Sequence, residues 1–553
     1  MSPAPRLRSR VLLAGVALLA GLPVCADAVR DQEAARRQEL CVPGTVIGTI
    51  EVVRVNVFDP RVKGEDRLFF RVVNFLHSPN LTREGTIRRV IPIREGDPCD
   101  PQRLEETERD LRAMGFLQDA WVETVARRGN AVDVRVRVQD AWTTRLHVSA
   151  NTQGGKSQTA VRLFEENLLG TGTTIGYESD HDQDRSTRTA QLSSAALLGR
   201  HLQFGLVSSS NSDGYDRSLT FGRPFWSLET PEMFQLDLRR LERDEKVYLG
   251  PDPVDVWRLR GEFEQVLYGI ARPPLTGGRL VRWTFGVQHD RHAWAPSPAA
   301  DPVVDRPDLR PRDHDLLMGR LDWEWRRVDY RRVQYVNRAV RVEDLDVGAR
   351  AWVSVVASLP GLSKDRGGTL TATVQRGFAP GERTFLTIAG ATEISRIGAD
   401  WYNALTSVDL RWYRRLGTYQ TVYVRGYVAN GASLEGQRRL LLGGDTGLRG
   451  YKSRAFSGER LVLLDVEHRF FAPWEWLHIF RAGLVTFVEA GGAWDGGFSR
   501  SAIHPDVGVG LRLAILRSSH GTTLHFNVAA PLDRSADPEK KAVRFSFLTL
   551  TTF

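Results

Sequence analysis

Long apolar runs are almost absent from this chain of 553 residues. Past the N-terminus, no stretch approaches the roughly 20 apolar residues that a membrane-spanning helix needs. With 42% hydrophobic residues and a mean hydropathy of −0.30, the chain is not a helical-bundle membrane protein. A barrel of transmembrane strands passes both tests, because only alternate residues in strands of roughly 9–11 residues must be apolar.

Cysteine is also scarce, with three residues in the chain. Cys25 lies in a segment that we interpret as a secretory signal peptide, residues 1–28. Three arginines precede the apolar run 11–24, and Ala26-Asp27-Ala28 supplies small residues for cleavage. A lipoprotein signal is the alternative, but the sequence before Cys25 lacks the small residue expected there.

The two remaining cysteines, Cys41 and Cys99, both lie in the first hundred residues. An even number of cysteines in an oxidising compartment predicts a disulfide between them. Two unrelated free thiols are the alternative.

Charge of one sign is not concentrated anywhere. The formal charge of +8 falls to +6 without residues 1–28, and the surplus is spread along the chain. We therefore expect no nucleic-acid partner. A basic lumen, or contacts with anionic lipid headgroups, explains the surplus as well.

Motifs of catalysis and cofactor binding are missing too. There is no G-x-S-x-G and no H-E-x-x-H. Gly154-Gly-Lys-Ser157 has Ala150 where a phosphate-binding loop needs glycine, and we interpret it as a hairpin turn. The 12 histidines are scattered, and His289 and His292 lie in a strand-to-loop region. We expect no catalytic residue, no cofactor and no metal.

Residues 46–141 show a β-α-α-β-β order, after a short N-terminal segment at 29–45. The first helix is expected at 67–77, and Asp100 and Pro101 begin the second. The hairpin 121–140 alternates valines with charged residues, so one face should pack on the helices. Apolar helix positions at matching spacing are Leu68, Val72, Phe75, Leu76, Leu104, Leu111 and Met114.

From residue 142 to residue 553 the chain consists of alternating segments broken by turns, with up to twenty candidate strands. The Pro- and Asp-rich stretch 296–312 predicts a long loop. The charged tract 326–341 predicts a strand pair beyond the membrane or a polar lumen, because a midplane Arg or Lys facing lipid costs about 2–4 kcal/mol.

The C-terminal part carries the most specific motifs. A Gly-rich loop contains Leu448-Arg449-Gly450-Tyr451, and the strand 463–471 places Asp465, Glu467 and Arg469 on one face. The next strand places Phe487, Glu489 and Gly491 on one face. A carboxylate on a transmembrane strand must point inward and needs a cation there. Arg449 can supply it, because a guanidinium has five donors.

These motifs resemble the outer-membrane assembly and two-partner-secretion superfamily, also called the bacterial surface antigen family. Residues 46–141 resemble its periplasmic POTRA domain, and 142–553 its barrel. The resemblance implies sixteen antiparallel strands, a loop in which Arg449 pairs with Glu467 and Glu489, and a terminal strand signal at Phe553. It also implies a weak seam between the first and last strands, Thr143–Thr152 and Val543–Phe553.

The expected function is assistance to client polypeptides as they insert, assemble or translocate at the bacterial outer membrane. In the family such clients add a strand to the POTRA sheet edge. Expected partners are this client, outer-membrane lipid and lipopolysaccharide, around a monomeric barrel without nucleotide. The alternatives are a passive structural or pore-forming surface protein and a dedicated two-partner secretion pore. An enzyme is not expected.

Overall fold

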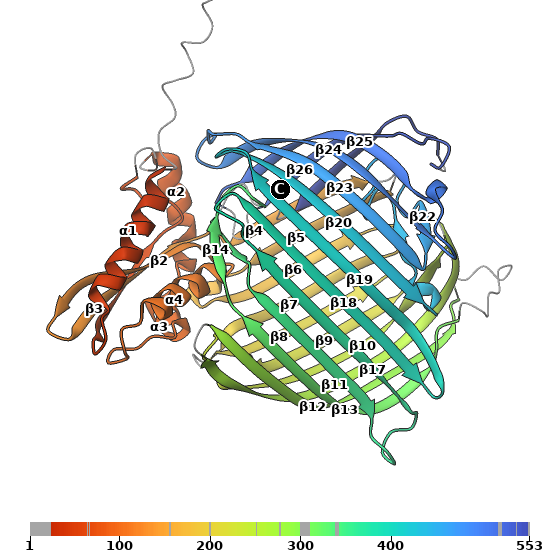
Figure 1. Cartoon of the computed structure of the whole chain (residues 1–553), viewed down its shortest axis with the longest axis horizontal. Coiled ribbons are helices and arrows are strands. Elements are labelled where there is room, and N and C mark those ends of the chain that lie inside the picture. The colour runs from red at the N-terminus through yellow and green to blue at the C-terminus, as the bar shows by residue number, and fades with distance from the viewer. Residues whose placement is uncertain are drawn as a thin grey trace, which may run out of the picture.

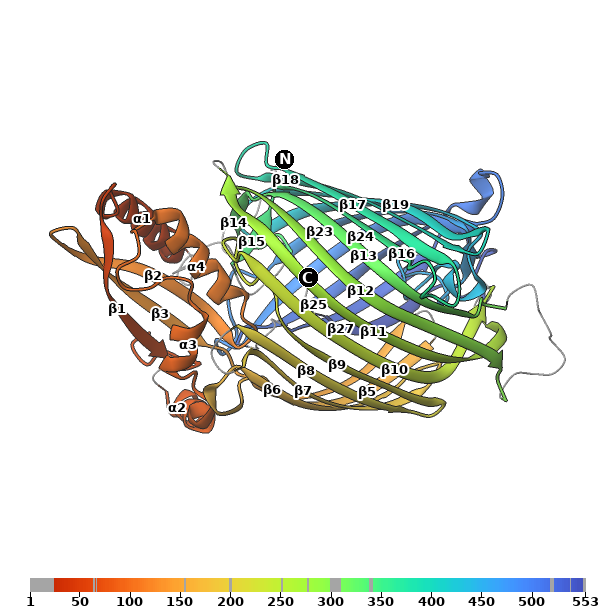
Figure 2. The ribbon, with the colours of Figure 1, turned by 90° about the horizontal axis from the view of Figure 1, so that it is seen from below.

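Two units follow each other along the chain in the computed structural model, a small α+β domain and a closed barrel (Figures 1 and 2). The structure describes residues 24–62, 65, 67–153, 156–197, 201–249, 252–275, 278–298, 310–337, 342–517, 522–537 and 539–550. The predicted strand signal at Phe553 and most of the predicted signal peptide lie outside these residues. Among the described residues, no helix is long and apolar enough to cross a membrane.

The small domain is a three-stranded sheet covered by helices. Its sheet order is β1-β3-β2, with β1 parallel and β2 antiparallel to β3. The valines of β3 alternate with charged residues, and all four are buried against α4, as the sequence predicts. The elements are α1 (Val24–Leu40), β1 (Val46–Val55), α2 (Leu68–His77), η1 (Ser78–Asn80), α3 (Glu84–Val90), α4 (Pro101–Ala113), β2 (Leu117–Arg128) and β3 (Ala131–Asp140).

A disulfide joins Cys41, just after α1, to Cys99, just before α4. Both cysteines belong to the buried core of the small domain, beside Ile47 and Leu104. The bridge therefore fastens the segment that enters β1 to the start of α4.

The helices differ from the expectation in three ways. Among the described residues, three α-helices, not two, lie between β1 and β2, because α3 (Glu84–Val90) was not predicted. The short N-terminal segment at 29–45, for which no structure was predicted, is helical to Leu40, and side chains of α1 bond to β2. The apolar face of α2 was expected to pack inward, but Leu68, Phe75 and Leu76 are exposed. The core of the domain is already filled by α4 and the sheet, so α2 is fixed by its opposite face, through Phe70 and His77.

The barrel has twenty strands within the described residues, and the prediction of sixteen is wrong. Apart from the closing pair β4–β27, every two neighbouring strands share at least seven paired positions among the described residues, so they are separate strands of the wall. The strands, in chain order, are β4 (Thr144–Gln153), β5 (Lys156–Glu165), β6 (Thr173–His181), β7 (Ser186–Leu197), β8 (Leu202–Asn211), β9 (Gly214–Arg223), β10 (Glu232–Tyr248), β11 (Pro253–Leu275), β12 (Arg279–Pro296), β13 (His314–Arg327), β16 (Ala349–Ser358), β17 (Gly367–Phe378), β18 (Thr384–Ile397), β19 (Asp400–Arg415), β20 (Gln420–Ala432), β23 (Arg460–Phe471), β24 (Phe480–Trp494), β25 (His504–Ile515), β26 (Thr523–Pro531) and β27 (Arg544–Leu550).

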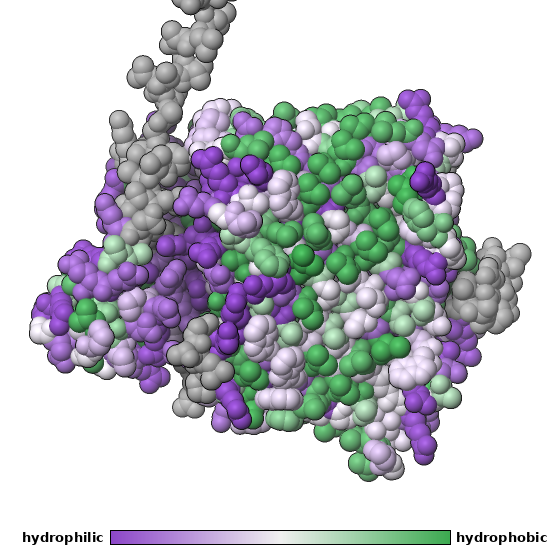
Figure 3. Space-filling model, viewed as in Figure 1, coloured by the Kyte–Doolittle hydropathy of each residue, from purple (hydrophilic) through white to green (hydrophobic). Residues whose placement is uncertain are grey.

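The outer wall of the barrel is apolar at alternate positions. Exposed side chains such as Val148, Val266, Phe285 and Val509 come from different strands, and apolar surface covers much of the visible wall (Figure 3). The small domain beside it is largely hydrophilic on the same face. This is the pattern of a wall that faces lipid, with a polar domain in water.

The barrel closes between its first and last strands, β4 and β27. Among the described residues, this closure is recorded at one residue pair, Phe547 with Thr152. The neighbouring pairs β26–β27 and β4–β5 have seven and ten paired positions. Residues 154–155 and 551–553, which follow these strands along the chain, lie outside the described residues.

Short elements complete the two ends of the barrel. At the end beside the small domain, β14 (Tyr330–Val333) and β15 (Glu343–Asp346) pair as a two-stranded sheet that is not part of the barrel wall. At the other end, β21 (Leu440–Leu442) and β22 (Phe456–Gly458) flank the motif loop. The remaining short helices are η2 (Leu168–Gly170), η4 (Gly436–Arg438) and η5 (Arg500–Ala502).

Candidate functional site

The motif loop connects β20 to β23 and folds back into the lumen. Leu448 and Tyr451 anchor it, because both are fully buried in an apolar cluster with Leu442, Leu461 and Leu463. The hydroxyl of Tyr451 donates to the carbonyl oxygen of Pro505 at 2.9 Å. These contacts bring the residues between Leu448 and Tyr451 against the inner wall.

Gly450 is required by this close approach. A Cβ atom here would lie 2.8 Å from the Cβ of Asp506 and 2.9 Å from the backbone nitrogen of Pro531. The backbone N–H of Gly450 donates to the Asp506 carboxylate at 2.8 Å. Gly491 meets a similar limit on the wall side, 2.5 Å from the carbonyl oxygen of Val462.

Arg449 bonds to three carboxylates on two adjacent strands. Its Nε donates to Glu489 at 2.8 Å, and its Nη2 donates to Glu467 at 2.6 Å and to Asp465 at 3.3 Å. Its backbone N–H also donates to Glu489, at 2.8 Å. The guanidinium lies over the ring of Phe487, 3.7 Å from the centroid. The structure thus brings together every residue of the predicted motif.

A second arginine completes the cluster. Arg469 donates through Nε to Glu467 at 2.7 Å and lies over the Tyr423 ring at 4.1 Å. Only 2% of the Glu489 side chain and 12% of the Arg449 side chain is exposed. We call Arg449, Asp465, Glu467, Arg469 and Glu489 the latch. Charge-assisted bonds of this density can hold a loop in one position, and the latch has no nucleophile paired with a base.

Two residues of the latch region were not predicted as participants. Asp465 shares the face of Glu467, but was not assigned as a partner of Arg449. Asp506 lies opposite Glu489 in the β24–β25 register. The spacing of Asp465 and Glu467 could have indicated the first role, whereas the role of Asp506 depends on which residues of neighbouring strands lie side by side.

The latch is also connected to the small domain. Arg469 donates through Nη1 to the carbonyl oxygen of Val336, at 3.2 Å, in the turn of the β14–β15 hairpin. At its other end, the hairpin pairs through Asp344 with Arg112 of α4 at 2.9 Å. Arg332 approaches Glu108 of the same helix, at 4.0 Å. A continuous set of polar contacts therefore runs from α4 to Arg449.

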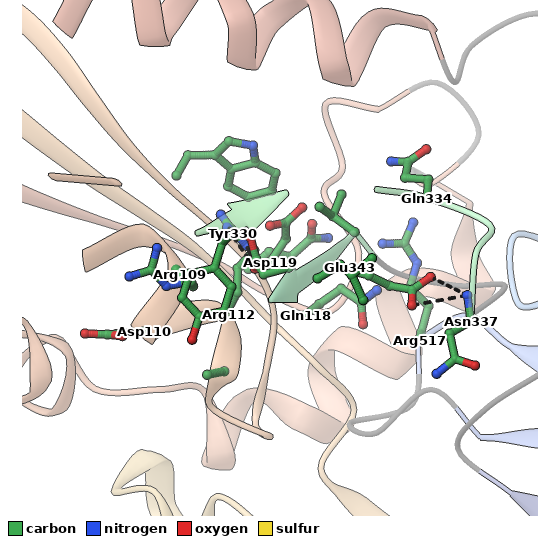
Figure 4. Close-up of a pocket in the computed structure, with 16 residues that line it drawn as sticks. Arg109, Asp110, Arg112, Gln118, Asp119, Tyr330, Gln334, Asn337, Glu343 and Arg517 are labelled. Atoms are coloured by element: carbon green, nitrogen blue, oxygen red, sulfur yellow. Dashed lines mark hydrogen bonds and ion pairs between the residues drawn. The ribbon is translucent and has the colours of Figure 1, made fainter. Parts of the chain in front are cut away.

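A cavity of about 560 Å³ lies where the small domain meets the hairpin (Figure 4). Side chains of both charge signs line the cavity, among them Arg109, Arg112, Arg517, Asp119 and Glu343. Figure 4 shows Glu343 bonded to the backbone of Asn337, at 2.9 Å. The mixed charge of its lining gives no preference for an ionic small molecule of one sign.

Asp110 of α4 lies at the edge of the same cavity. Burial, and then the charge of nearby Glu106, raise the pKa of Asp110 to about 7. Burial likewise raises the pKa of Glu106, against the bond it accepts from the backbone N–H of Leu228. The ionised forms of these two carboxyl groups therefore destabilise the folded domain at neutral pH.

Both edges of the small sheet are covered. On β2, the outward N–H of Thr124 donates to Glu33 of α1 at 2.6 Å, and the carbonyl oxygen of Val122 accepts from Arg37. On β1, the N–H of Ile50 donates to Glu95 at 3.0 Å, and its carbonyl oxygen accepts from Arg88. The expected addition of a client strand to this sheet therefore requires one of these covers to move.

Comparison with known proteins identifies the small domain. Residues 72–140 match the POTRA family model, described as a surface antigen variable number repeat. A comparison with curated protein sequences finds no match. The chain therefore combines a POTRA domain with a closed antiparallel barrel, which confirms the predicted fold class.

Solved barrels of the predicted superfamily are similar to the chain at low identity. BamA from Haemophilus ducreyi, lacking POTRA domains 1–3, is 14% identical with a TM-score of 0.40, and the match covers 92% of this chain and 85% of that chain. CdiB from Escherichia coli is 13% identical with a TM-score of 0.46, over 92% and 77% of the two chains. CdiB from Acinetobacter baumannii is 11% identical with a TM-score of 0.45, over 91% and 74%. These likenesses are distant, so the function proposed below depends on the geometry of this chain.

Proposed function

We propose that this protein is an outer-membrane barrel that helps client polypeptides to insert, assemble or translocate at the outer membrane. Its POTRA domain lies in the periplasm. The barrel is a monomer, and its apolar outer wall contacts lipid and lipopolysaccharide. The observation that carries the proposal is the seam between β4 and β27, where the described residues form one pair. The POTRA domain directly precedes β4 along the chain, so it is attached at this seam.

An opened seam supplies what a client strand needs. Unpaired strand edges present a row of N–H and C=O groups that template the pairing of another strand. Among the described residues one pair joins β4 and β27, whereas β26–β27 and β4–β5 have seven and ten pairs, which supports this seam as the place of opening. Client folding and the burial of strand edges then provide the free energy, without a nucleotide.

The latch and the POTRA domain have complementary roles in this proposal. The latch holds the motif loop, which connects β20 to β23, against the luminal face of β23 and β24, and the β14–β15 hairpin connects the latch to α4. A client that displaces α1 from β2 would change the contacts of α4, because Glu108 bonds both Arg37 and Arg112. POTRA binding and loop position are then coupled through one helix.

A reversible crosslink across the seam tests the proposal. Thr152→Cys with Phe547→Cys should form a disulfide that holds the seam shut. Val161→Cys with Ser179→Cys is the matched control, an outward-facing pair on β5 and β6 whose ladder is complete. The readout is the amount of pulse-labelled outer-membrane and exported host proteins that reach their final location.

We expect the seam crosslink to lower this amount several-fold, with recovery on reduction, and the control to have no effect. Equal client handling with the seam locked and unlocked would contradict the proposal. A passive pore predicts that equality, together with a steady single-channel conductance that is unchanged by the crosslink.

A further inference from the structure

Two histidines and an aspartate converge on the luminal face of β12 and β13, away from the latch. Asp290 and His292 lie two residues apart on β12, so their side chains share one face. His314 is the direct cross-strand neighbour of His292. The outward positions of β12, Trp283, Phe285 and Val287, carry the exposed apolar side chains, so this set points into the lumen.

Distances within the set match the edges of a metal coordination sphere. The Nε2 atom of His292 lies 3.4 Å from Oδ1 of Asp290, and the Nε2 atom of His314 lies 3.6 Å from Oδ2. One ligand atom from each residue can be chosen so that all lie within 4.8 Å of one another. Four ligands at about 2.0–2.1 Å from a tetrahedral ion are roughly 3.3 Å apart. By comparison, a charge-assisted bond would be about 2.7–2.9 Å long.

The charges around Asp290 favour a cation in this place. Within the described parts of the chain, no Arg or Lys forms an ion pair with Asp290. The basic residues that line the same luminal cavity have other partners: Arg312 pairs with Asp400, Arg320 with Asp322, and Lys246 with Asp184. The cavity, of about 620 Å³, has room for a water ligand beside the histidines.

We propose that Asp290, His292 and His314 bind one divalent transition-metal ion of the Zn²⁺ class, with water in the remaining position. Imidazole and carboxylate are suitable ligands for Zn²⁺, and also for Ni²⁺ and Cu²⁺, which bind such sites at least as well in the order of intrinsic affinity. The ion would fasten β12 to β13 near the ends that lie far from the POTRA domain.

The sequence expectation of no metal site did not consider this set. His292 and His314 are separated by a loop along the chain, and only the β12–β13 register makes them neighbours. His289, which stood out with His292 in the sequence, points outward and pairs with Asp315 instead, at 2.9 Å.

Titration of the full-length protein with Zn²⁺ tests the proposal. The protein, in detergent and without a polyhistidine tag, is stripped with a chelator and titrated calorimetrically, and Co²⁺ serves as a spectroscopic probe. We expect one site per chain and the visible absorption of a low-symmetry Co²⁺ complex. His314→Ala and His292→Ala should each weaken Zn²⁺ binding by at least about 100-fold, more than the loss of an outer-shell partner.

His289→Ala is the matched control, since it removes a histidine from the same strand but from the opposite face. It should bind Zn²⁺ as the wild type does. Heat-modifiable migration on gels confirms that each variant has folded. Absence of a stoichiometric site in the wild type, or equal binding by all variants, would overturn the assignment.

A different observation supports a second proposal, for α2. Five exposed apolar side chains cover one face of this short helix: Leu68, Phe69, Val72, Phe75 and Leu76. The buried residue Phe70 packs with Ile479 and lies 6.2 Å, ring to ring, from His478, in the turn between β23 and β24. That turn also exposes Trp474, Trp476 and Leu477.

We infer that the exposed face of α2 lies in the lipid interface of the periplasmic leaflet. The turn at 472–479 is the rim of the wall that faces lipid, so the apolar surface of α2 continues that of the barrel. Arg67 and Arg71 are exposed at the same helix and suit anionic headgroups. On the other side, Asn80 bonds Glu165 of β5, so this segment spans the periplasmic end of the seam.

Fluorescence quenching by spin-labelled lipid tests this placement in the full chain reconstituted into vesicles of phosphatidylethanolamine and phosphatidylglycerol. A fluorophore on Phe75→Cys should be quenched strongly. The same fluorophore on Glu105→Cys, an exposed position of α4, should not. Equal weak quenching at both positions would contradict the inference, and would leave a protein partner as the occupant of this face.

Discussion

Arg449 is the residue on which most of the predicted site depends, because it bonds three carboxylates from β23 and β24. Arg449→Ala leaves these carboxylates in the lumen without their shared guanidinium, and Arg469 still pairs with Glu467. Loss of one partner of a buried pair costs about 3–5 kcal/mol, less where water reaches it. We expect the barrel to fold while the motif loop loosens and client handling falls.

Accessibility of a cysteine at Ser453, which is 1% exposed, measures the loosening. Arg449→Lys should rescue poorly, because an ammonium group cannot bond two strands as a planar guanidinium does. Glu489→Asp keeps the charge and should be the mildest change. Wild-type accessibility and client handling in Arg449→Ala would show that the cluster is not a latch.

Asp110 provides a prediction on pH. Its folded pKa of about 7 lies above the ordinary value of 3.8, so the folded state holds the proton more tightly. POTRA stability from this group is therefore complete below pH 4 and is lost as pH rises to about 7. Asp110→Asn should flatten this dependence and stabilise the domain at pH 8 by about 1 kcal/mol, from denaturant melts at both pH values. An unchanged pH slope would contradict the assignment.

The family resemblance predicted the pairing of Arg449 with Glu467 and Glu489, and residue types supported it, since inward carboxylates need a cation. The same reasoning could not identify Asp506 or His314. Their contacts depend on strand register, which a sequence with turns of uncertain length does not determine.

At the scale of elements, α1 covers the edge of β2. Glu33 accepts bonds from both the N–H and the hydroxyl of Thr124. Glu33→Ala should increase hydrogen exchange at Thr124 and strengthen binding of an extended peptide to the sheet. Glu39→Ala is the matched control, as an exposed residue of the same helix. If both variants exchange alike, α1 is not the cover that limits access.

The Cys41–Cys99 disulfide stabilises the same region. It closes a loop with a sequence separation of 58 residues. Such a loop corresponds to roughly 4 kcal/mol in the chain-entropy model, an upper figure. Reduction should lower the melting temperature of the POTRA domain and leave the barrel unchanged on gels. Stoichiometric alkylation of both thiols in unreduced protein would contradict the bridge.

Sequence patterns predicted α4 and the β2–β3 hairpin well, because a capping Asp100, a proline and alternating valines each have a local cause. The position of α2 was mispredicted for a physical reason. An apolar face on a helix indicates that the face is kept from water, but it does not indicate whether the protein core or lipid covers it.

At the scale of the whole molecule, the fold class followed from alternation over hundreds of residues, and the number of strands did not. Up to twenty candidate segments were counted from the residues, but sixteen strands were predicted because of the resemblance, and that prediction was wrong. The alternation of apolar and polar residues indicates each strand separately. The number of strands is a property of the closed barrel, and barrels of different sizes show the same alternation.

Photocrosslinking at the seam tests the central claim most directly. A photoreactive residue replaces Val148 on β4 or, as the control, Val266 on β11. Both side chains face outward and are 70% and 60% exposed, but only Val148 lies on a strand of the seam. After illumination of cells with pulse-labelled proteins, we expect discrete adducts with newly made polypeptides from Val148 and none from Val266. The same adducts from both positions, or none from either, would contradict the claim that clients pass through the β4–β27 seam.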